Sequence, residues 1–575
     1  MAIPQQVACS AKSHAGPCDE SSHISIRVGI SEEEKAAVKN RSELVLKALK
    51  NLGLNVKKVP VVSVLVSGGG LRAAIACQGV LSELSHVGLL DKVTYVAGVS
   101  GSTWCMSSLF SQSDRWKDLN KAENEFRQRL QNGPGDISTV VDGLCNAAAR
   151  DDYSLTDLWL YSVVYCLTSE FLSTCLSHVR EQSGMGTVPY PVFAAIDHHL
   201  KKNGREINAW FEFTPDWAGY STLDQSTPGA YVSTTHCGSK FEEGKLIQEK
   251  PERDFSYLQA LCGSALADKD VIKEKIKEFM EFIFHPETQE KMLFTDPEEV
   301  TLTNILEELF NLVYTFKTHG DCLLILENLK HIMTGEKDFS EALAWINEMI
   351  DSWGKSSQDD QEKLIKDFLR KSSMEVLEGL SNVPSFRRFL HKTIWRLLLW
   401  KWGTTNNFLY KYGHIKDKTL TEKENIHLID AGLAINSAYP LVLPPVRNTD
   451  IILSFDFSAG DPFETIKATE KYCKAGNIPF PPVDDSKLDQ DAKHPCDLYI
   501  FEGEKVPVVM HFPLFNKVNC GSEEVIKQRH KTYETFRFTK YSDEEVCQLL
   551  EDSKANVRNN KDAIYEKICK RAEAP

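Results

Sequence analysis

Apolar and polar residues follow two distinct patterns near the start of the chain. Over residues 32–52, apolar positions recur at helical spacing among charged ones, which predicts an amphipathic helix. Residues 61–66 instead form a continuous valine-rich run, as buried strands do, and the run stops at Ser67-Gly68-Gly69-Gly70. Helix-forming residues resume directly after these glycines. This order predicts a strand, a glycine turn and a helix.

The same order repeats further along the chain. Residues 93–97 predict a second strand, and Gly98-Val99-Ser100-Gly101-Ser102 leads from it into a helix that runs to about Phe110. Strand patterns return at residues 426–429 and 451–455. Consecutive strand–turn–helix units imply parallel strands joined by helical crossovers. We therefore expect an α/β fold with a central, mostly parallel sheet flanked by helices.

A different texture interrupts the predicted sheet. Between about residues 267 and 400 the pattern is helical and heavily charged, as in residues 272–284 and 302–312, and it predicts an inserted helical cap or lid. The first residues of the chain are polar and offer too little apolar surface to offset the entropy of ordering them. The sequence thus predicts a flexible tail over residues 1–30 and a single domain over residues 31–575 that contains the cap.

Composition and charge narrow the class of protein. The chain has 575 residues, and 42% of them are hydrophobic. When its 32 glycines are counted as apolar too, the apolar fraction is that of an ordinary globular protein. The 66 basic and 81 acidic residues give a net charge of −15, which argues against a nucleic-acid partner, because no global cationic field attracts phosphate. Neither a secretory signal nor a run of 18 uncharged apolar residues is present. The 15 cysteines lack metal-ligand spacing, so we expect reduced thiols in a cytoplasmic protein with no metal and no cofactor.

The turn after the second predicted strand carries a candidate nucleophile. In Gly-x-Ser-x-Gly turns a sharp bend between strand and helix presents the serine oxygen, and glycines relieve the steric conflict. Here the last glycine is replaced by Ser102. The alternative is an ordinary strand–helix turn whose serine caps the helix. Our hypothesis is that Ser100 is the acyl-accepting nucleophile.

The glycine turn after the first predicted strand offers candidate oxyanion donors. Backbone amides exposed at a helix N-terminus can receive a developing negative charge, and Gly69 and Gly70 are the donors we expect. A phosphate-binding loop is a poor rival because its Lys-Ser/Thr ending is absent. Arg72 would offer a charge for a lipid phosphate or stabilise the loop, and the alternative is a solvated surface arginine.

The candidate base is less obvious. Asp430-Ala431-Gly432 follows a predicted strand and has a small turn that would aim the carboxylate into the same pocket as Ser100. This arrangement predicts a Ser/Asp dyad, in which Asp430 takes the serine proton and returns it to the leaving alcohol. Asp-x-Gly is also a common turn. A Ser-Asp-His triad would instead need one of the late histidines, which are His494, His511 and His530.

These three motifs together resemble a known family. Residues 67–72, residues 98–104 and Asp430-Ala431-Gly432 are similar to the signatures of the cytosolic (group IV) phospholipases A2. Four longer stretches resemble the gamma type of this family: residues 189–195, 210–215, 403–410 and 453–461. The resemblance covers most of residues 30–565 and is weakest in the helical insertion.

The resemblance implies a fold and an activity. It implies a patatin-like α/β fold, a lid over the site, and calcium-independent hydrolysis of glycerophospholipid acyl esters through an acyl-serine. It assigns Ser100 as nucleophile, Asp430 as base, Gly69 and Gly70 as oxyanion donors, and Arg72 as phosphate contact. Lysophospholipase and acyltransferase activity are also implied, because water or a lysolipid hydroxyl can intercept an acyl-enzyme.

Two features of the family pattern are missing from this chain. Many relatives carry an N-terminal calcium-binding C2 domain, but only 66 residues precede Ser67, too few for a β-sandwich of about 100 residues. We therefore expect no C2 domain and no calcium requirement. The chain also ends without a prenylation box.

A basic and aromatic stretch predicts contact with a membrane surface. Residues 379–416 contain no Asp or Glu but seven Lys or Arg, interleaved with aromatic side chains. We expect an interfacial helix on an anionic leaflet, with these candidate contacts: Arg387, Arg388, Lys392, Trp395 and Arg396. The alternative is a core helix with snorkelling arginines. The expected location is cytoplasmic, peripherally on intracellular membranes such as the endoplasmic reticulum or nuclear envelope.

Two other functions compete with a dyad phospholipase. One is a catalytically silent lipid-binding or scaffold protein of the same fold, and the other is an α/β-hydrolase with a histidine triad. The presence of Ser100, Asp430 and the glycine turn favours an enzyme. The expected partners are a phospholipid surface and its lipids, and the sequence names no protein partner.

Overall fold

The chain divides into two compact units in the computed structural model, which describes residues 23–132, 137–221, 229–264, 270–284, 297–334, 339–378, 385–535, 537 and 540–574. The first unit comprises residues 1–134, 163–265 and 405–575, and the second comprises residues 135–162 and 266–404. The second unit therefore takes in the expected insertion at about 267–400. It also takes in residues 135–162, which the sequence pattern had not set apart.

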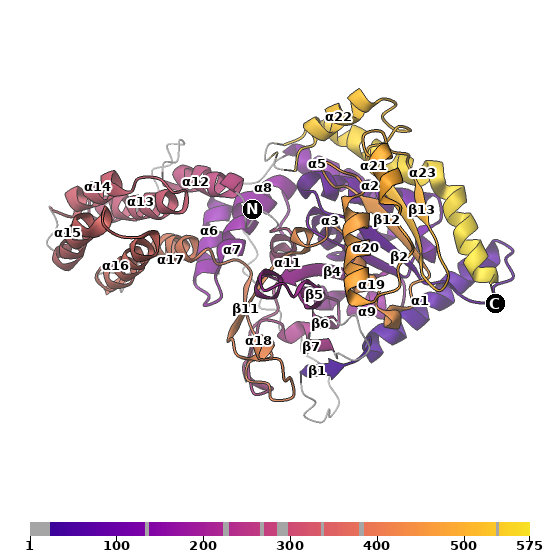
Figure 1. The fold of residues 1–575 in the computed structure, drawn as a ribbon, viewed down its shortest axis with the longest axis horizontal. Helices are drawn as coiled ribbons and strands as arrows, with labels where there is room; N and C mark the ends of the chain where they lie inside the picture. Colours follow the sequence, from indigo (N-terminus) through magenta and orange to yellow (C-terminus); the bar gives the residue numbers. More distant parts are fainter. Residues whose placement is uncertain are drawn as a thin grey trace. The chain divides into compact units, whose positions relative to one another are not determined.

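The first unit is built on one mixed sheet (Figure 1). Its main path runs in the order β1-β7-β6-β5-β4-β3-β2-β12-β14-β13. The strands are β1 Ile24–Arg27, β2 Val62–Val66, β3 Tyr95–Gly98, β4 Tyr190–Asp197, β5 Trp210–Phe213, β6 Trp217–Tyr220, β7 Gly229–Ser233, β12 Ile451–Asp456, β13 Tyr499–Phe501 and β14 Val508–Pro513. The central strands from β4 to β14 are parallel, and the outer strands pair antiparallel. The expected parallel sheet is thus the middle of a larger mixed one.

Two further strands lie off this path. Strand β11 (Asn425–Asp430) pairs antiparallel with β4 and also pairs with β10 (Thr404–Asn406). A separate hairpin is formed by β8 (Lys240–Glu242) and β9 (Lys245–Gln248).

The start of the described chain corrects one expectation. Ile24 to Arg27 form β1, which pairs antiparallel with Val232 to Gly229 of β7. The expected tail over residues 1–30 is therefore wrong for these four residues, because β7 satisfies their backbone groups and Ile24 is buried. Residues 1–22 lie outside the described part of the chain.

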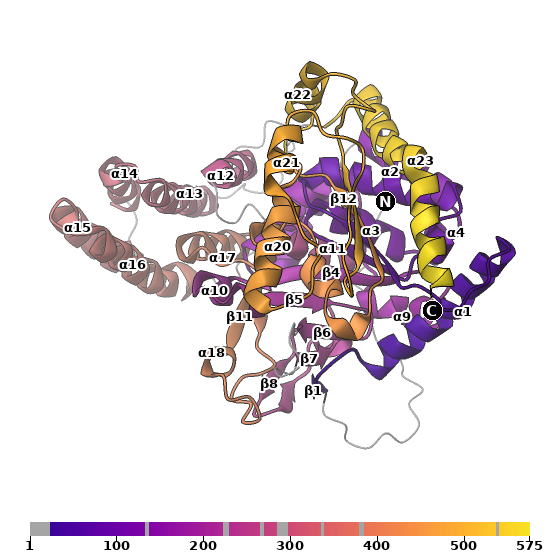
Figure 2. The same ribbon diagram turned by 45° about the vertical axis from the view of Figure 1, so that its right-hand side comes forward.

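Helices cover both faces of the sheet. Helix α2 (Gly70–His86) connects β2 to β3, and α20 (Glu464–Gly476) lies between β12 and β14, on the other side of β2. Because parallel crossovers are right-handed, connections in opposite directions place these helices on opposite faces. Figure 2 shows α20 in front of the strands and α3 (Gly101–Phe110) behind them.

One close helix crossing completes the layer on the α2 side. Helix α2 packs along α3 and along the long C-terminal helix α23 (Asp543–Glu573). A Cβ on Gly79 of α2 would stand 2.2 Å from Ser553 Oγ and 3.0 Å from the Leu550 carbonyl oxygen, so only glycine permits this approach. The remaining helices of the unit are α1 Glu32–Asn51, α4 Ser113–Lys117, α5 Leu119–Asn132, α8 Tyr165–Thr168, α9 Arg180–Gly184, α10 His198–Lys202, α11 Phe255–Cys262, α18 Lys418–Thr421, α19 Tyr439–Val442, α21 Asp485–Asp491 and α22 Glu523–Thr532.

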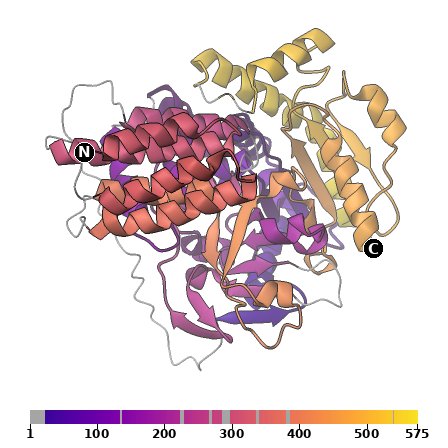
Figure 3. The same cartoon turned by 60° about the vertical axis from the view of Figure 1, so that its left-hand side comes forward.

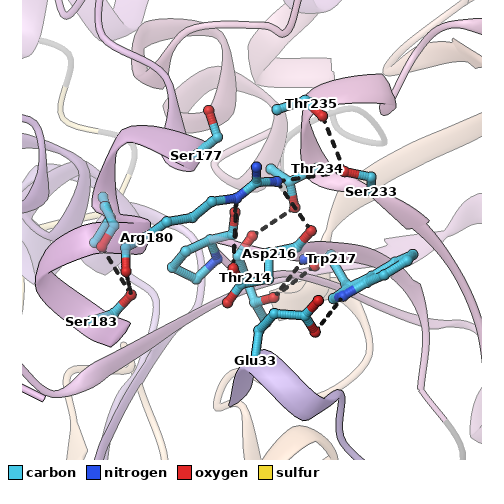
Figure 4. Close-up of polar contacts among 12 residues, drawn as sticks. Glu33, Ser177, Arg180, Ser183, Thr214, Asp216, Trp217, Ser233, Thr234 and Thr235 are labelled. Atoms are coloured by element: carbon cyan, nitrogen blue, oxygen red, sulfur yellow. Dashed lines mark hydrogen bonds and ion pairs between the residues drawn. The ribbon is translucent and has the colours of Figure 1, made fainter. Parts of the chain in front are cut away.

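Two polar clusters, one of them buried, fasten the antiparallel half of the sheet. In the first, Arg447 pairs with Glu34 of α1 (Nε to Oε1, 2.8 Å) and with Glu212 of β5 (Nη1 to Oε2, 2.7 Å). In the second, Arg180 of α9 donates from Nε to the carbonyl of Pro215 at 2.9 Å (Figure 4). The three side chains of the first cluster are all nearly inaccessible to solvent. These contacts hold α1 and α9 against the strands beside β4.

The second unit is helical. Its helices are α6 Ile137–Ala148, α7 Leu155–Trp159, α12 Asp270–Phe284, α13 Pro297–Lys317, α14 Leu323–Met333, α15 Ser340–Trp353, α16 Gln358–Glu378 and α17 Ser385–Leu399. Figure 3 shows several of them lying side by side. Helix α17 packs against α6 and α13. Within the described residues, no helix combines the length and the apolar character that crossing a bilayer requires.

Helix α17 contains the candidate membrane contacts. Its apolar side chains, including Phe389, Leu390 and Leu397, are buried within the unit. Among the five candidates, Arg388 is exposed, Arg387 is buried, and Lys392, Trp395 and Arg396 are half-buried. Lys392 donates to the carbonyl of Arg150 at 2.8 Å, and Arg396 to that of Asp151 at 3.3 Å. The apolar side of α17 thus packs as the core-helix alternative describes.

Candidate active site

Ser100 occupies a strained turn between β3 and α3. Its φ of 54° and ψ of −130° lie outside the regions that non-glycine residues usually adopt, and it stands at the N-cap position of α3. Its side chain makes no capping hydrogen bond, so the alternative of a capping serine does not describe it. The turn is held by Ser102, whose hydroxyl donates to the Ser67 carbonyl at 2.6 Å. A nucleophile turn requires a serine with a strained backbone whose hydroxyl does not cap the helix, and Ser100 has both features.

Asp430 and the nucleophile turn meet on one edge of strand β4. On one side β4 pairs with β5, and on the other side it pairs first with β3 and then with β11. Gly98, the last residue of β3, lies opposite Phe193, whereas Asp430, the last residue of β11, lies opposite Ala195. Two residues along a strand span roughly 7 Å. The two strands therefore end facing each other, with Ser100 and Asp430 at their adjoining ends.

Asp430 is fully buried and held by its own turn. Its Oδ1 accepts the N–H of Gly432 at 2.7 Å. Cys262, at the end of α11, lies close by, since burial and then the Asp430 charge raise the pKa of its thiol. This local fold explains why a small residue and a glycine follow the aspartate.

Gly68 lies between Ser100 and a residue that the sequence did not single out. A Cβ on Gly68 would stand 2.6 Å from Ser100 Cβ and 2.4 Å from Asn436 Oδ1. A Cβ on Gly432 would stand 2.9 Å from the same Asn436 oxygen and 3.0 Å from Asp430 Oδ1. Asn436 therefore lies between the nucleophile turn and the candidate base. The one sequence signal that could have identified Asn436 is its position, six residues after Asp430.

Gly69 and Gly70 lie at the start of α2, beside the nucleophile turn. Their φ values of 152° and 62° favour glycine. A Cβ on Gly101 would stand 2.0 Å from the Gly70 carbonyl oxygen, so the two turns are in direct contact. The first N–H groups of a helix have no acceptor within it. The geometry therefore brings two potential donors next to Ser100.

Arg72 is enclosed rather than directed to solvent. Its Nε donates to the Phe457 carbonyl at 2.8 Å, one Nη donates to the Tyr533 carbonyl, and the other donates to Thr535 Oγ1 at 3.1 Å. Burial lowers the pKa of its guanidinium. These contacts match the loop-stabilising role, one of the roles that the sequence left open, and leave no side of the guanidinium exposed for a lipid phosphate.

Two of the three late histidines have a ring nitrogen on a backbone carbonyl. His494 Nε2 lies 3.1 Å from the Gly521 carbonyl oxygen, and His511 Nε2 lies 2.8 Å from that of Pro462. Burial, with the nearby charge of Arg72, lowers the pKa of His530 to about 4. Within the described residues, no group of three His, Cys, Asp or Glu side chains is placed to hold a metal ion.

An apolar cavity lies near the candidate base. Its volume is about 50 Å³, and its wall includes Leu258 and Leu261 of α11 and Leu428 of β11. Leu428 precedes Asp430 by two residues and so shares its face of the strand. The same wall also includes Glu252 and Arg253, so charged side chains border this cavity together with the leucines.

Comparisons with known proteins show the family to which this chain is related. Residues 62–266 match the family model described as lysophospholipase catalytic domain. The chain is 43% identical over 558 residues to cytosolic phospholipase A2 gamma of Homo sapiens, covering 95% of this chain and 96% of that protein.

Solved structures show the same fold. Human GIVD cytosolic phospholipase A2 matches with a TM-score of 0.62 at 22% identity, over 96% of this chain and 66% of that chain. The same human protein in complex with methyl gamma-linolenyl fluorophosphonate matches with a TM-score of 0.59 at 23% identity, over the same shares of both chains. At these identities the likeness concerns the fold alone.

Proposed function

Because the chain belongs to the cytosolic phospholipase A2 family and is a phospholipase that hydrolyses phospholipid acyl esters, we propose that it does so through a Ser100/Asp430 dyad and without calcium. The observation that carries the proposal is the meeting of β3 and β11 on one edge of β4, which brings a strained serine next to a buried aspartate. The glycine turn that touches the nucleophile turn supports the rest of the mechanism.

In the acylation step, the Asp430 carboxylate accepts the proton of Ser100 Oγ while that oxygen attacks the ester carbonyl carbon. The carbonyl oxygen becomes an oxyanion, which the N–H groups of Gly69 and Gly70 stabilise. The bond from carbon to the glycerol oxygen then breaks, and Asp430 returns the proton to the leaving lysolipid. The products of this step are an acyl-serine and a lysophospholipid.

In the deacylation step, water attacks the acyl-serine and gives its proton to Asp430. The carbon–Oγ bond breaks, the fatty acid leaves, and Ser100 recovers the proton. A lysolipid hydroxyl in place of water would make the enzyme an acyltransferase, and a lysophospholipid as the first substrate would make it a lysophospholipase.

Arg72 and the late histidines are not assigned a role in the proton transfer. Arg72 is proposed to hold the glycine turn in place, since its donors end on the Phe457 and Tyr533 carbonyls and on Thr535. A histidine triad has less support, because His494 and His511 each have a ring nitrogen on a backbone carbonyl, and no hydrogen bond links His530 to Ser100 within the described residues.

The lipid surface is the proposed partner. We place the enzyme in the cytoplasm, peripherally on an internal membrane, with Arg388 and Trp395 of α17 as the remaining contact candidates. The helical unit that contains α17 is proposed to be the lid. Glutamate in place of Arg388 is expected to weaken binding to anionic vesicles several-fold, and unchanged binding would remove α17 from the proposal.

The main experiment measures fatty-acid and lysolipid release from mixed-chain phosphatidylcholine vesicles with excess calcium chelator. Wild type is expected to be active, and Ser100→Ala and Asp430→Asn are expected to lose at least about a thousandfold in rate. Asp417→Asn is the matched control, because Asp417 also caps a short helix through its carboxylate. The identity of the released chain reports the positional preference.

Covalent labelling tests the assignment of Ser100 as nucleophile. A fluorophosphonate probe is expected to label wild type and to leave Ser100→Ala unlabelled. Labelling of Ser100→Ala at the wild-type rate would refute the nucleophile assignment. Loss of activity in His494→Ala, His511→Ala or His530→Ala, with the fold retained, would replace the dyad by a triad.

A further inference from the structure

The peptide between Gly68 and Gly69 is held by one side chain. Asn436 donates from Nδ2 to the Gly68 carbonyl oxygen at 3.1 Å, and the Gly68 N–H donates to the Asn436 carbonyl at 3.2 Å. In a trans peptide the C=O and the following N–H point in opposite directions. The hydrogen bond to the Gly68 carbonyl therefore sets the direction of the Gly69 N–H, which is one of the two proposed oxyanion donors.

The orientation of the Asn436 amide is itself fixed. A carbonyl oxygen only accepts, so the nitrogen of the amide must face Gly68. The same nitrogen bonds Ser458 Oγ at 2.7 Å, and the Ser458 N–H donates to Asp456 Oδ1 at 2.8 Å, next to the end of β12. The amide oxygen then lies on the side of Ser100 and Gly432. Asn436 is thus fastened to the parallel core of the sheet.

The glycine turn needs such a fastening. Gly69 and Gly70 adopt positive φ values, and peptides flanked by glycines change conformation at little steric cost. Arg72 stabilises the turn from the helix side, through the Phe457 carbonyl and residues 533–535. Asn436 is the side chain that grips the Gly68–Gly69 peptide itself.

We propose that Asn436 is a positioning residue for ester hydrolysis, which locks the Gly68–Gly69 peptide so that the Gly69 N–H stays directed at the developing oxyanion. This inference rests on the proposed function of the same site. It adds a residue that touches neither the scissile bond nor the leaving group, and acts through the backbone donor.

The test compares Asn436→Ala and Asn436→Asp with wild type on a soluble p-nitrophenyl ester. Aspartate keeps the shape of asparagine but cannot donate to Gly68, so both variants are expected to lose the lock. We expect kcat to fall roughly 10- to 100-fold at nearly unchanged KM, because loss of an oxyanion donor acts on the transition state. Asn406→Ala is the matched control, since Asn406 also donates from Nδ2 to a glycine carbonyl, that of Gly238, at 2.9 Å.

A second readout separates positioning from a general structural effect. A long-chain alkyl trifluoromethyl ketone adds the serine oxygen and leaves an oxyanion in the same place as the substrate does. Its affinity is expected to fall in the Asn436 variants by about the same factor as kcat. A matched ether without a carbonyl is expected to bind as in wild type, and the unfolding temperature of Asn436→Ala is expected to stay close to that of Asn406→Ala.

The outcomes distinguish this inference from the function on which it rests. Activity of Asn436→Ala within about threefold of wild type, or equal losses of affinity for the ketone and the ether, would overturn the positioning role alone. A wild type that hydrolyses neither the ester nor phospholipid would overturn the dyad and the positioning role together.

Discussion

Replacing Arg72 by methionine is expected to lower the free energy of unfolding of the first unit by about 2–4 kcal/mol. Methionine preserves much of the length of the side chain but removes its donors, so the Phe457 and Tyr533 carbonyls and Thr535 lose their partner. Each buried acceptor left unpaired costs about 1–3 kcal/mol. The change also removes a guanidinium that burial disfavours, which offsets part of this loss.

The same substitution tests what Arg72 does for catalysis. If Arg72 anchors the glycine turn, Arg72→Met lowers kcat for phosphatidylcholine and for a phosphate-free p-nitrophenyl ester by similar factors. The kcat of Arg72→Lys is expected to lie between those of wild type and Arg72→Met, because one ammonium group cannot reach three separated acceptors. Urea unfolding and steady-state kinetics on both substrates give the two measurements.

Arg41→Met is the matched control. Arg41 is also buried, and it also donates to three acceptors, the carbonyls of Val93, Gly186 and Leu90, at 2.8, 3.1 and 2.8 Å. Its replacement is expected to cost similar stability with little effect on kcat. Arg72 is not an anchor of the turn if Arg72→Met unfolds like wild type and loses only phospholipid affinity, because that pattern marks a phosphate contact.

Three further predictions follow from buried contacts. Gly68→Ala is expected to lower kcat about 100-fold, because its Cβ would stand 2.4 Å from Asn436 Oδ1 and 2.6 Å from Ser100 Cβ. Gly413→Ala is the control and is expected to remain active, because the space around Gly413 is open. Equal kinetics of the two variants would contradict this prediction. His530 stays neutral in the folded state down to a pKa of about 4, so the unfolded state binds the extra proton and stability falls by up to about 3 kcal/mol as pH drops from 6.5 to 4. His530→Gln should flatten this dependence in urea titrations, and an unchanged slope would count against it. Arg447→Met removes the guanidinium that is paired with the buried Glu34 and Glu212, and it is expected to cost about 3–5 kcal/mol by urea unfolding. The double variant that also carries Glu34→Gln is expected to lose less, and a smaller loss in the single variant than in the double variant would contradict this prediction.

The parts of the site that follow local rules were visible in the sequence. A valine-rich strand, a glycine turn and a serine at the start of a helix each leave a short signature, because strand burial and turn strain act on neighbouring residues. The turn at Ser100 has the positive φ that such a signature implies. The family model and the solved structures confirm the α/β fold that these signatures predicted.

Long-range pairing left no such trace. The opposition of Asp430 to Ala195 depends on strand register, and nothing near residue 430 encodes its partner on β4. Arg72 looks like a surface residue of a first helical turn, yet Tyr533 and Thr535 enclose it from more than 400 residues away. Helix α17 shows a second limit of sequence-based prediction, because basic and aromatic residues suit a membrane surface and a core helix alike. The hydrogen bond from Lys392 to a backbone carbonyl is visible only in the structure.

The packing of α23 on α2 has a consequence for the order in which the protein is made. The glycine turn and Ser100 leave the ribosome early, but β12, the residues that hold Arg72 and the helix that covers α2 come after residue 450. At about 5–20 residues per second, roughly 25–90 s separate the two stages. During that interval α2 lacks the helix that packs along it, and Arg72 lacks the partners that hold the glycine turn. A nascent chain therefore carries Ser100 well before the residues that complete its surroundings have been made.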